Sequence, residues 1–176
     1  MVGRNGQGVR MRDVAEEAGV SRQAVYDHFG SRAELMVATA RYGDEVRGLE
    51  ERLGGYRAAT GGVERLGAFV EFWGNYIPEI HGIARALLAA RETDEAVAAA
   101  WDDRMRVVQE ACNDIVGRLQ RDGVLAPGWS VEEAGQMLWS LLSISTWENL
   151  TLERRWPVSL YVARMKELTK RAFVGP

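Results

Sequence analysis

The stretch VAEEAGVSRQAVYDHFGSRAEL, residues 14–35, decides the class of fold at the start of this chain. Val14 and Ala18 stand four residues apart, which is the spacing of one face of an α-helix. Gly19 follows and can take the positive φ that ends a helix, and Ser21 is a favourable N-cap for another helix. The stretch therefore predicts two short helices joined by a tight turn, the arrangement of a helix-turn-helix.

The second helix, predicted over 22–28, carries polar side chains on the face opposite its apolar residues Val25 and Phe29. A helix presented in this way fits the major groove of DNA, where side chains reach the edges of the bases. The guanidinium of Arg22 can bridge guanine N7 and O6, and the amide of Gln23 can pair with adenine. The pattern therefore predicts a DNA-binding head.

The chain after this head is expected to be helical throughout. From 32 to 53, apolar residues recur at three- and four-residue steps, which predicts one long helix that begins at a capping box of Ser31 and Glu34. The same periodicity, interrupted by prolines and glycines, predicts five further helices, over 63–77, 80–90, 95–122, 131–150 and 158–173. The predicted fold class is therefore all-α.

Composition excludes several classes of protein. The 176 residues include one cysteine, Cys112, and two histidines, so neither an internal disulfide nor a Cys/His metal site can form within one chain. No apolar run reaches the roughly 18 residues that cross a membrane, and the N-terminus lacks the apolar centre of a secretory signal. No sequence pattern brings a nucleophile and a base together. We therefore expect a cytoplasmic protein that is not an enzyme, has no cofactor or metal, and keeps Cys112 buried.

Charge is distributed unevenly along the chain. Residues 1–41 contain six arginines and five acidic residues, whereas residues 42–176 contain sixteen basic and twenty acidic residues. The net charge of −3 argues against a general polyanion binder. The relatively basic N-terminal part permits contact with nucleic acid without requiring it. We divide the chain into two predicted domains, 1–41 and 42–176, and note the glycine-containing stretch 54–62 as a candidate boundary in the helical pattern.

Residues 14–35 resemble the DNA-binding head of the TetR family of transcriptional regulators. The residues that carry the resemblance are Val14-Ala15, Ala18-Gly19-Val20-Ser21, Tyr26, His28-Phe29, Ser31-Arg32 and Leu35. The resemblance implies a homodimeric repressor whose head, 1–41, binds a double-stranded DNA operator. It implies that 42–176 form a helical ligand-binding and dimerisation domain, and that a small-molecule effector releases the protein from a palindromic operator.

The resemblance also assigns roles to the polar residues of the motif. Asp27 either accepts a hydrogen bond from a cytosine amino group or is simply exposed, and His28 either contacts DNA or ends its helix as a structural residue. The positions that resemble those at base edges are Arg22, Gln23, Ala24 and Asp27. Those that resemble phosphate-positioning residues are Tyr26, His28 and Arg32. Independently of the resemblance, the helix N-termini at Ser21 and Ser31 offer backbone N–H groups to phosphates.

Two features depart from the family's pattern. The family places a full helix before the motif, whereas residues 1–10 are rich in glycine and lack periodicity, so we expect that helix to be absent. Arg10 stands where the family has a Ser or Thr N-cap, and the lost cap costs about 1 kcal/mol unless Arg10 meets a phosphate instead. We therefore expect a loosely packed head with incomplete amide-exchange protection over 11–29.

The domain 42–176 offers candidates for an effector pocket and for a dimer interface. Tryptophans at helical spacing are usually core residues, but they also line pockets between helices. Helices 131–150 and 158–173 are expected to pair two subunits as a four-helix bundle, because 137–147 are apolar nearly all round. The candidates for contact with a mostly apolar effector are Trp73, Tyr76, Trp101, Gln109, Asn113, Trp139, Ser143 and Trp147.

A second hypothesis stays open at this point. The chain is then a dimeric helical ligand-binding or protein-interaction module whose DNA-binding head is not functional. The expected lack of a first helix and the weak positive charge of residues 1–41 favour this hypothesis. Selection of the protein against random duplex DNA separates the two hypotheses, because only a functional head enriches a palindrome.

Overall fold

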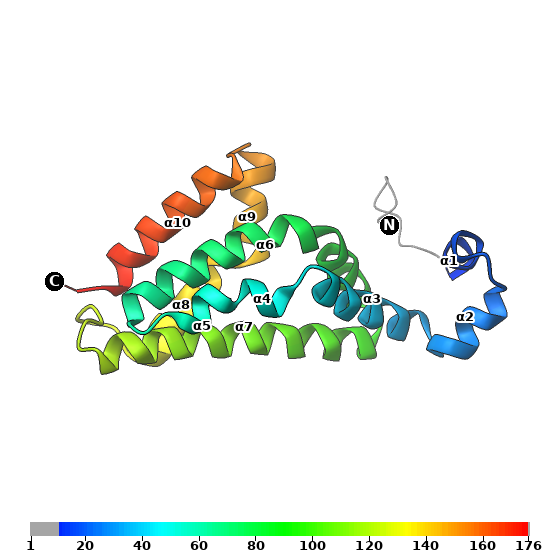
Figure 1. Cartoon of the computed structure of the whole chain (residues 1–176), viewed down its shortest axis with the longest axis horizontal. Coiled ribbons are helices and arrows are strands. Elements are labelled where there is room, and N and C mark those ends of the chain that lie inside the picture. Colours follow the sequence, from blue (N-terminus) through cyan, green and yellow to red (C-terminus); the bar gives the residue numbers. More distant parts are fainter. Residues whose placement is uncertain (1–10, 176) are drawn as a thin grey trace. The chain divides into compact units, whose positions relative to one another are not determined.

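A computed structural model describes residues 11–175, and Figure 1 shows helices along this part of the chain. The first helices are α1 (Met11–Ala18), α2 (Arg22–Phe29), α3 (Arg32–Val46), α4 (Leu49–Arg52), α5 (Gly54–Ala58) and α6 (Gly62–Ala90). Those that follow are α7 (Glu95–Arg121), α8 (Val131–Leu141), α9 (Ile144–Glu148), the π-helical turn η1 (Asn149–Glu153) and α10 (Val158–Phe173). The predicted all-α class is confirmed, and an isolated antiparallel bridge joins Leu125 to Val174.

The predicted pair of short N-terminal helices is confirmed as α1 and α2. The predictions made for residues 1–10, which are an absent first helix and the contribution of Arg10, lie outside the described residues.

The chain packs into two compact units. Of the described residues, the first unit contains 11–47 together with Ile80–Arg104, and the second contains Gly48–Glu79 together with 105–175. Helices α6 and α7 therefore contribute residues to both units. The functional division into 1–41 and 42–176 stays a prediction, because a unit of packing is not an assignment of function.

Within the first unit, helix α3 is tied to α7 by an ion pair. Nη2 of Arg104 lies 2.6 Å from Oδ2 of Asp44, and only 29% and 16% of these side chains are exposed. A second ion pair joins Arg91, just after α6, to Asp102 of α7 at 3.1 Å. Short hydrogen bonds between charged groups are stronger than neutral ones, and partial burial protects the first pair from screening. The C-terminal part of α3 is therefore held in place within its unit.

The predicted single helix over 32–53 is wrong. Helix α3 ends at Val46, and Gly48 adopts a left-handed conformation with φ 62° and ψ 42°. A residue with a Cβ is disfavoured in this conformation, so the glycine lets the chain turn before α4 begins. The apolar repeat that predicted one helix continues into α4, which is a separate helix after the turn at Gly48.

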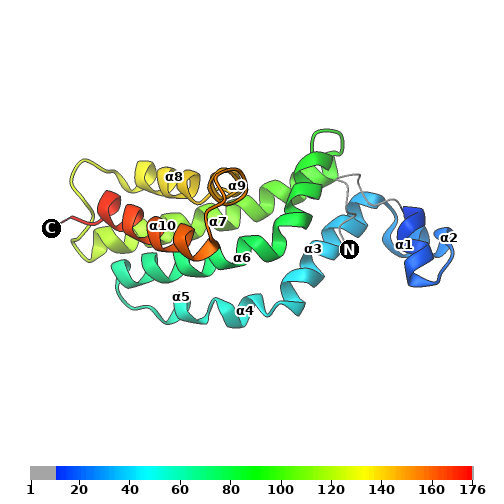
Figure 2. The same ribbon diagram turned by 90° about the horizontal axis from the view of Figure 1, so that it is seen from above.

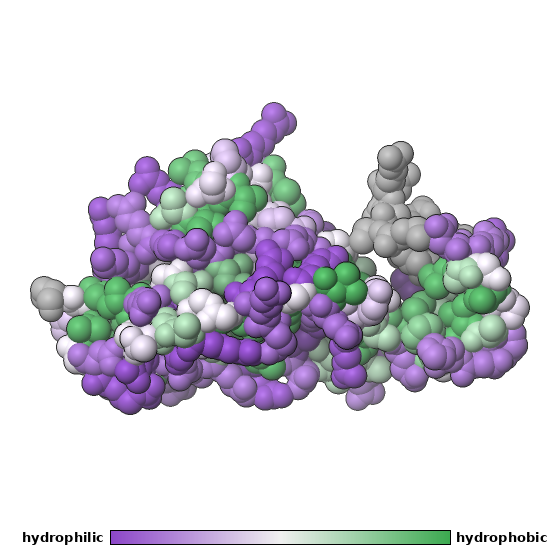
Figure 3. Space-filling view, in the orientation of Figure 1, coloured by the Kyte–Doolittle hydropathy of each residue, from purple (hydrophilic) through white to green (hydrophobic). Residues whose placement is uncertain are grey.

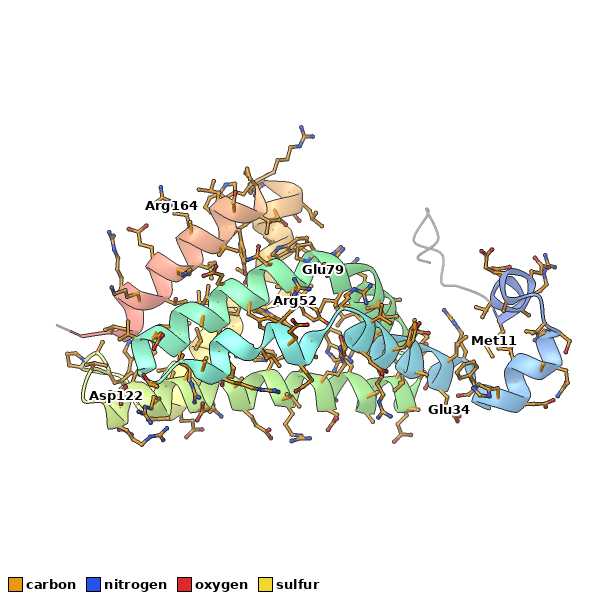
Figure 4. The ribbon with its side chains drawn as sticks, in the orientation of Figure 1. Met11, Glu34, Arg52, Glu79, Asp122 and Arg164 are labelled. Atoms are coloured by element: carbon orange, nitrogen blue, oxygen red, sulfur yellow. The ribbon has the colours of Figure 1, made fainter. Side chains whose placement is uncertain are left out.

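Helix α4 is attached to α6 by Arg52. Its Nη1 and Nη2 donate to the two carboxylate oxygens of Glu79 at 2.9 and 2.7 Å, and Figure 4 shows the two residues side by side. The guanidinium carbon of Arg52 also lies 5.3 Å from the ring centroid of Tyr76. A two-pronged bond to a carboxylate combined with a cation–π contact fixes the direction of the guanidinium. Arg52 thereby connects two segments of the second unit that are distant in sequence.

The core of the second unit lies where α6, α7, α8 and α10 bury their apolar sides. Figures 1 and 2 show α6 and α10 side by side. Gly74 permits this approach, because a Cβ there would lie 2.7 Å from Cγ2 of Val162. The fully buried side chains of this unit include Leu66, Val70, Tyr76, Ile77, Ile115, Leu119, Leu138, Leu142, Tyr161 and Phe173.

The predicted break between 63–77 and 80–90 is wrong, because α6 runs through Pro78 without interruption. A proline inside a helix removes one backbone donor and clashes with the preceding turn, at a cost of about 3 kcal/mol. The apolar residues on both sides of it, including Ile77, Ile80 and Leu87, are buried and favour continuation of the helix. Tertiary packing therefore outweighs the local preference of proline.

The predicted helix over 131–150 is also wrong in its second half. Helix α8 ends at Leu141, and Ser143 starts α9 by accepting a hydrogen bond from the N–H of Thr146 at 3.1 Å. A serine that caps the backbone in this way competes with continuation of the helix. The segment proposed for dimerisation therefore contains a bend, followed by the π-helical turn η1.

The predictions for the two remaining helices are confirmed, over Glu95–Arg121 and Val158–Phe173. The capping box expected at the start of α8 is present, with Ser130 and Glu133 bonded in both directions. Cys112 is buried, as predicted, and burial raises the pKa of its thiol to about 12. Among the helices of residues 11–175, none is both long and apolar enough to cross a membrane.

Candidate nucleic-acid interface

The turn between α1 and α2 is a glycine-based helix end. Gly19 has φ 68°, and its N–H donates to the carbonyl of Glu16 at 3.3 Å. The N–H of Val20 donates to the carbonyl of Ala15 at 3.0 Å. These two bonds close a Schellman motif, in which the residue after the helix takes a positive φ. The predicted role of Gly19 is therefore confirmed.

A small apolar core holds α1 and α2 together. Because Val25 faces this core, helical geometry places residues 23 and 27 on the opposite side of α2 and residue 24 on its flank. That side is exposed, so its polar groups are available to a partner. The buried members of the core are Met11, Ala15 and Val25, and the partly buried residues packed against them are Val14, Tyr26, Phe29 and Leu35.

Two serines cap helices beside this surface, as predicted. The Oγ of Ser21 accepts from the N–H of Ala24 at 3.0 Å, and the Oγ of Ser31 accepts from the N–H of Glu34 at 3.1 Å. The second half of the capping box expected at Ser31 is wrong, because its N–H donates to the carbonyl of Phe29 at 2.6 Å. The positive ends of α2 and α3 both favour an anion such as a phosphate.

Arg22 and Ala24 are exposed on α2, and their contact with base edges stays a prediction. The guanidinium carbon of Arg22 lies 5.4 Å from the ring centroid of Tyr26. The face of an aromatic ring attracts a cation, so this contact gives the long Arg22 side chain a preferred direction.

Gln23 and Asp27 form a second pair on the exposed face of α2. Nε2 of Gln23 donates to Oδ1 of Asp27 at 2.7 Å, across one turn of the helix. An amide and a carboxylate four residues apart are a known signal for such a bond. Sequence analysis identified both residues but did not consider that they bind each other.

The three candidates for phosphate contact lie in different surroundings. Tyr26 is half-buried in the small core, whereas His28 and Arg32 are exposed. The His28 ring meets the Phe29 ring edge-on, with centroids 4.5 Å apart. Arg32 occupies the first turn of α3, beside the positive helix end. Their contact with phosphate stays a prediction, and Arg10 lies outside the described residues.

The residues proposed to bind an effector are not gathered in one setting. Trp101 belongs to the first unit and the other candidates to the second. Within the second unit, the rings of Trp73 and Tyr76 lie 6.5 Å apart, and both residues are buried. The indole N–H of Trp73 donates to the carbonyl of Leu142 at 2.7 Å, so its polar group is already satisfied.

The polar candidates are also engaged. Nε2 of Gln109 donates to Oδ1 of Asn113 at 3.0 Å, and Asn113 is exposed. Ser143 caps α9. Ser143 and Trp139 are half-buried, whereas Trp147 is buried. An effector role for these residues stays a prediction.

Tyr161 of α10 is a residue that sequence analysis missed. It is fully buried, and its hydroxyl has no hydrogen-bond partner among the described residues. Burial raises the pKa of this hydroxyl to about 12. A buried hydroxyl without a partner costs about 1–3 kcal/mol, so Tyr161 is a further candidate for a polar contact with an effector. Only its position in a helix was predictable, since its surroundings depend on α6.

A surface hollow of about 480 Å³ lies elsewhere, along α8. It shares no residue with the predicted effector-binding set and is lined by Gly128, Trp129, Glu133, Gln136, Met137 and Ser140. Among residues 11–175, no group of three or more His, Cys, Asp or Glu side chains is arranged to hold a metal ion.

The geometry of α1, α2 and the start of α3 defines a helix-turn-helix protein with a helical C-terminal part. Residues 4–39 match the family model of the bacterial regulatory proteins of the tetR family. Over 108 residues the chain is 33% identical to the HTH-type transcriptional activator FasR of Mycolicibacterium smegmatis, and the match covers 60% of this chain. The match covers 47% of FasR, so the chain spans about half the length of this curated relative.

Solved structures share the fold over nearly the whole chain. A protein of Saccharomonospora viridis, described as a transcriptional regulator and solved in complex with choline, has a TM-score of 0.82 at 16% identity, over 99% of this chain and 92% of that one. The fatty acid degradation regulator FadR of Bacillus halodurans has a TM-score of 0.72 at 14% identity, over 94% and 89% of the two chains.

A bacterial regulatory protein of the tetR family from Rhodococcus RHA1 has a TM-score of 0.68 at 20% identity, over 99% and 90% of the chains. These structural likenesses establish the fold, and the match over 4–39 identifies that segment as a DNA-binding domain of the tetR type. The match over 4–39 and the similarity to FasR support a transcriptional regulator of the TetR family.

Proposed function

We propose that this protein is a transcriptional repressor that binds a palindromic DNA operator and leaves it when a small molecule binds. The observation that carries the proposal is the exposed polar face of α2, held on a closed helix-turn-helix core by Val25. Arg22 and Gln23 at the N-terminal end of this helix supply the donors and the acceptor that base edges require. Such a protein acts in the cytoplasm, and we propose no catalytic activity for it.

The proposal includes a homodimer that pairs through α8 and α10. Large apolar side chains on these helices remain exposed in the single chain: Met137 is 44%, Leu160 37% and Leu168 47% exposed. Figure 3 shows hydrophobic colour gathered over α9 and the first part of α10. Exposed apolar surface of this kind favours association with another protein surface. A two-fold dimer then requires an operator of two inverted half-sites.

The effector is proposed to enter the second unit beside α6 and α10. The aromatic residues Trp73 and Tyr76 and the unpartnered hydroxyl of Tyr161 support a mostly apolar molecule with one hydrogen-bonding group. Pockets for small molecules combine such apolar walls with a few polar groups. Gly48, whose backbone is left-handed between α3 and α4, is the proposed point where this segment bends in response.

Selection of the protein against random duplex DNA, followed by titration of the winners across salt concentration, tests the proposal. A palindrome whose affinity falls steeply with salt is expected, because binding to phosphates releases counterions. Tyr26→Phe, a variant of a proposed phosphate contact, should weaken binding to all sequences by a similar factor. Absence of enrichment would instead favour the helical module without a functional head.

The sign of regulation needs a separate measurement, since the relative FasR is an activator. A reporter gene placed behind the selected palindrome should be transcribed less when the protein is supplied. An increase in transcription would retain DNA binding and contradict repression.

A further inference from the structure

A negative charge stands in an unexpected place on α2. Asp27 lies on the side opposite Val25, at the centre of the face proposed to enter the major groove. Phosphates on both sides of the groove repel a carboxylate, so the residue lowers the affinity for DNA of every sequence. The hydrogen bond from Gln23 to Asp27 offers a functional reason for keeping a carboxylate that lowers the affinity for DNA.

The bond fixes which way the Gln23 amide faces. A carboxylate can only accept hydrogen bonds, so the group that approaches Oδ1 of Asp27 at 2.7 Å must be the NH2 of Gln23. An unrestrained glutamine can turn its amide and exchange the places of oxygen and nitrogen. Bound to Asp27, Gln23 uses one N–H and keeps one N–H and its carbonyl oxygen for a partner.

The groups that remain free match one base better than the others. Adenine presents an acceptor, N7, beside a donor, the N6 amino group, and so needs one donor and one acceptor. Guanine presents two acceptors, N7 and O6, and so needs two donors. The carboxylate of Asp27 takes one donor from Gln23 and also repels the acceptor-rich edge of guanine.

From this geometry we propose that Asp27 is a positioning residue that makes Gln23 select adenine over guanine in each half-site. Asp27 touches no base in this arrangement and acts through the amide of Gln23. The inference rests on the proposed function, because it requires α2 to enter the major groove.

The alternative is that Asp27 itself accepts from a cytosine amino group, and the two cases predict different couplings. If Asp27 acts through Gln23, its effect on base preference disappears once Gln23 is removed. If Asp27 reads cytosine directly, its effect persists without Gln23. A double-mutant cycle therefore separates positioning from direct contact.

The experiment measures the affinities of four full-length proteins, which are the wild type, Gln23→Ala, Asp27→Ala and the double variant. The base pair to be varied is identified first, as the position at which Gln23→Ala loses the base preference of the wild type. Each protein is then titrated against the selected palindrome with either A·T or G·C at this position. The wild type should prefer adenine about tenfold, and Asp27→Ala should reduce this ratio at least about threefold while strengthening binding to both duplexes. In the Gln23→Ala background, Asp27→Ala should leave the ratio unchanged.

Glu17→Ala is the matched control, because Glu17 is an exposed acid on α1 and has the same charge as Asp27. It should strengthen binding without changing the ratio of adenine to guanine. Thermal unfolding of each variant, followed by circular dichroism, checks that α2 remains folded.

An unchanged ratio in Asp27→Ala would overturn the inference, as would an equal change with and without Gln23. In both cases the wild type still selects a palindrome, so the proposed function survives. Failure of the wild type to select any sequence would remove the proposed function and this inference together.

Discussion

The helix-turn-helix and the second unit bury their apolar residues in different ways. The core of α1 and α2 contains the buried Met11, Ala15 and Val25, all close in sequence. The core of the second unit brings together distant segments, as when Gly74 of α6 meets Val162 of α10. Local signals of turns and caps therefore define the helix-turn-helix, whereas long-range packing defines the second unit.

The difference also concerns what the surface is used for. The outward face of α2 carries polar groups that are partly ordered by their neighbours, as in the Gln23–Asp27 bond. The outward faces of α8 and α10 leave large apolar side chains such as Met137 and Leu168 exposed. The first surface suits selective hydrogen bonding, and the second suits association through apolar contact.

The largest effect is expected from truncation of the second unit's core. Leu138 is fully buried in α8, so Leu138→Ala should lower the free energy of unfolding by about 3 kcal/mol through lost burial and a cavity. Gln136→Ala, at an exposed position of the same helix, is the matched control and should change it by less than about 0.5 kcal/mol. Equal effects of the two variants in urea titrations would contradict a continuous core.

A slightly smaller effect is expected on association. Leu168→Glu places a charge at an apolar position of α10 that is 47% exposed, and should weaken a dimer at least about a hundredfold. Sedimentation at micromolar concentration measures the change. Lys170→Glu, which alters charge at a neighbouring exposed position, should affect the dimer far less. A wild-type protein that sediments as a monomer would refute the dimer directly.

Two N-caps, one in each region, have separable effects on stability and DNA binding. Ser21→Ala and Ser130→Ala each remove an N-cap and should each cost about 1 kcal/mol in the stability of their own helix. Only Ser21→Ala should weaken DNA binding, because it disturbs α2. Melting curves and titrations against the selected palindrome measure both quantities. A loss of DNA affinity in Ser130→Ala of the same size would show that the two regions are not separable.

The smallest expected effect is a gain in stability. Tyr161→Phe removes a buried hydroxyl without a partner and should stabilise the protein by about 1 kcal/mol. Tyr56→Phe is the control, because the Tyr56 hydroxyl donates to Asp114 at 3.3 Å and its removal should not stabilise. Destabilisation by Tyr161→Phe in urea titrations would mean that the hydroxyl is satisfied in solution.

The same hydroxyl predicts a dependence on alkaline pH. The pKa of Tyr161 is raised to about 12 by burial, so the unfolded chain loses this proton first and stability falls as the pH rises from 10 to 12. Below pH 10 the hydroxyl is protonated in both the folded and the unfolded chain, so its titration does not change the free energy of unfolding there. The buried thiol of Cys112 acts in the same direction from pH 9 upward. Tyr161→Phe should therefore make the free energy of unfolding fall less steeply above pH 10, while the contribution of Cys112 remains.

Sequence analysis predicted the local features and missed several that depend on packing. The turn at Gly19 and the caps at Ser21 and Ser130 follow from residue types at fixed spacing, and the structure confirms them. The continuity of α6 through Pro78 depends on burial of residues far along the helix, which no local rule contains. Gly48 could have indicated a break in the helix, but the apolar repeat continues past it and led to the prediction of one helix.

The candidate site divides in the same way. The helical positions of Val25 and Phe29 predicted the exposed face of α2. The spacing of four residues between Gln23 and Asp27 could also have predicted their hydrogen bond, but this bond was not predicted. The effector candidates were chosen by residue type alone. The buried hydroxyl of Tyr161 depends on the approach of α10 to Gly74, which periodicity cannot predict.

A repeated selection with Arg22→Ala tests whether the outward face of α2 contacts base edges. The variant should enrich a palindrome that differs from the wild-type one at a single base pair in each half-site, with about 1–3 kcal/mol of discrimination lost there. Arg12→Ala, which removes an exposed arginine from α1, should enrich the wild-type sequence. Enrichment of one identical palindrome by the wild type and by Arg22→Ala would contradict this contact.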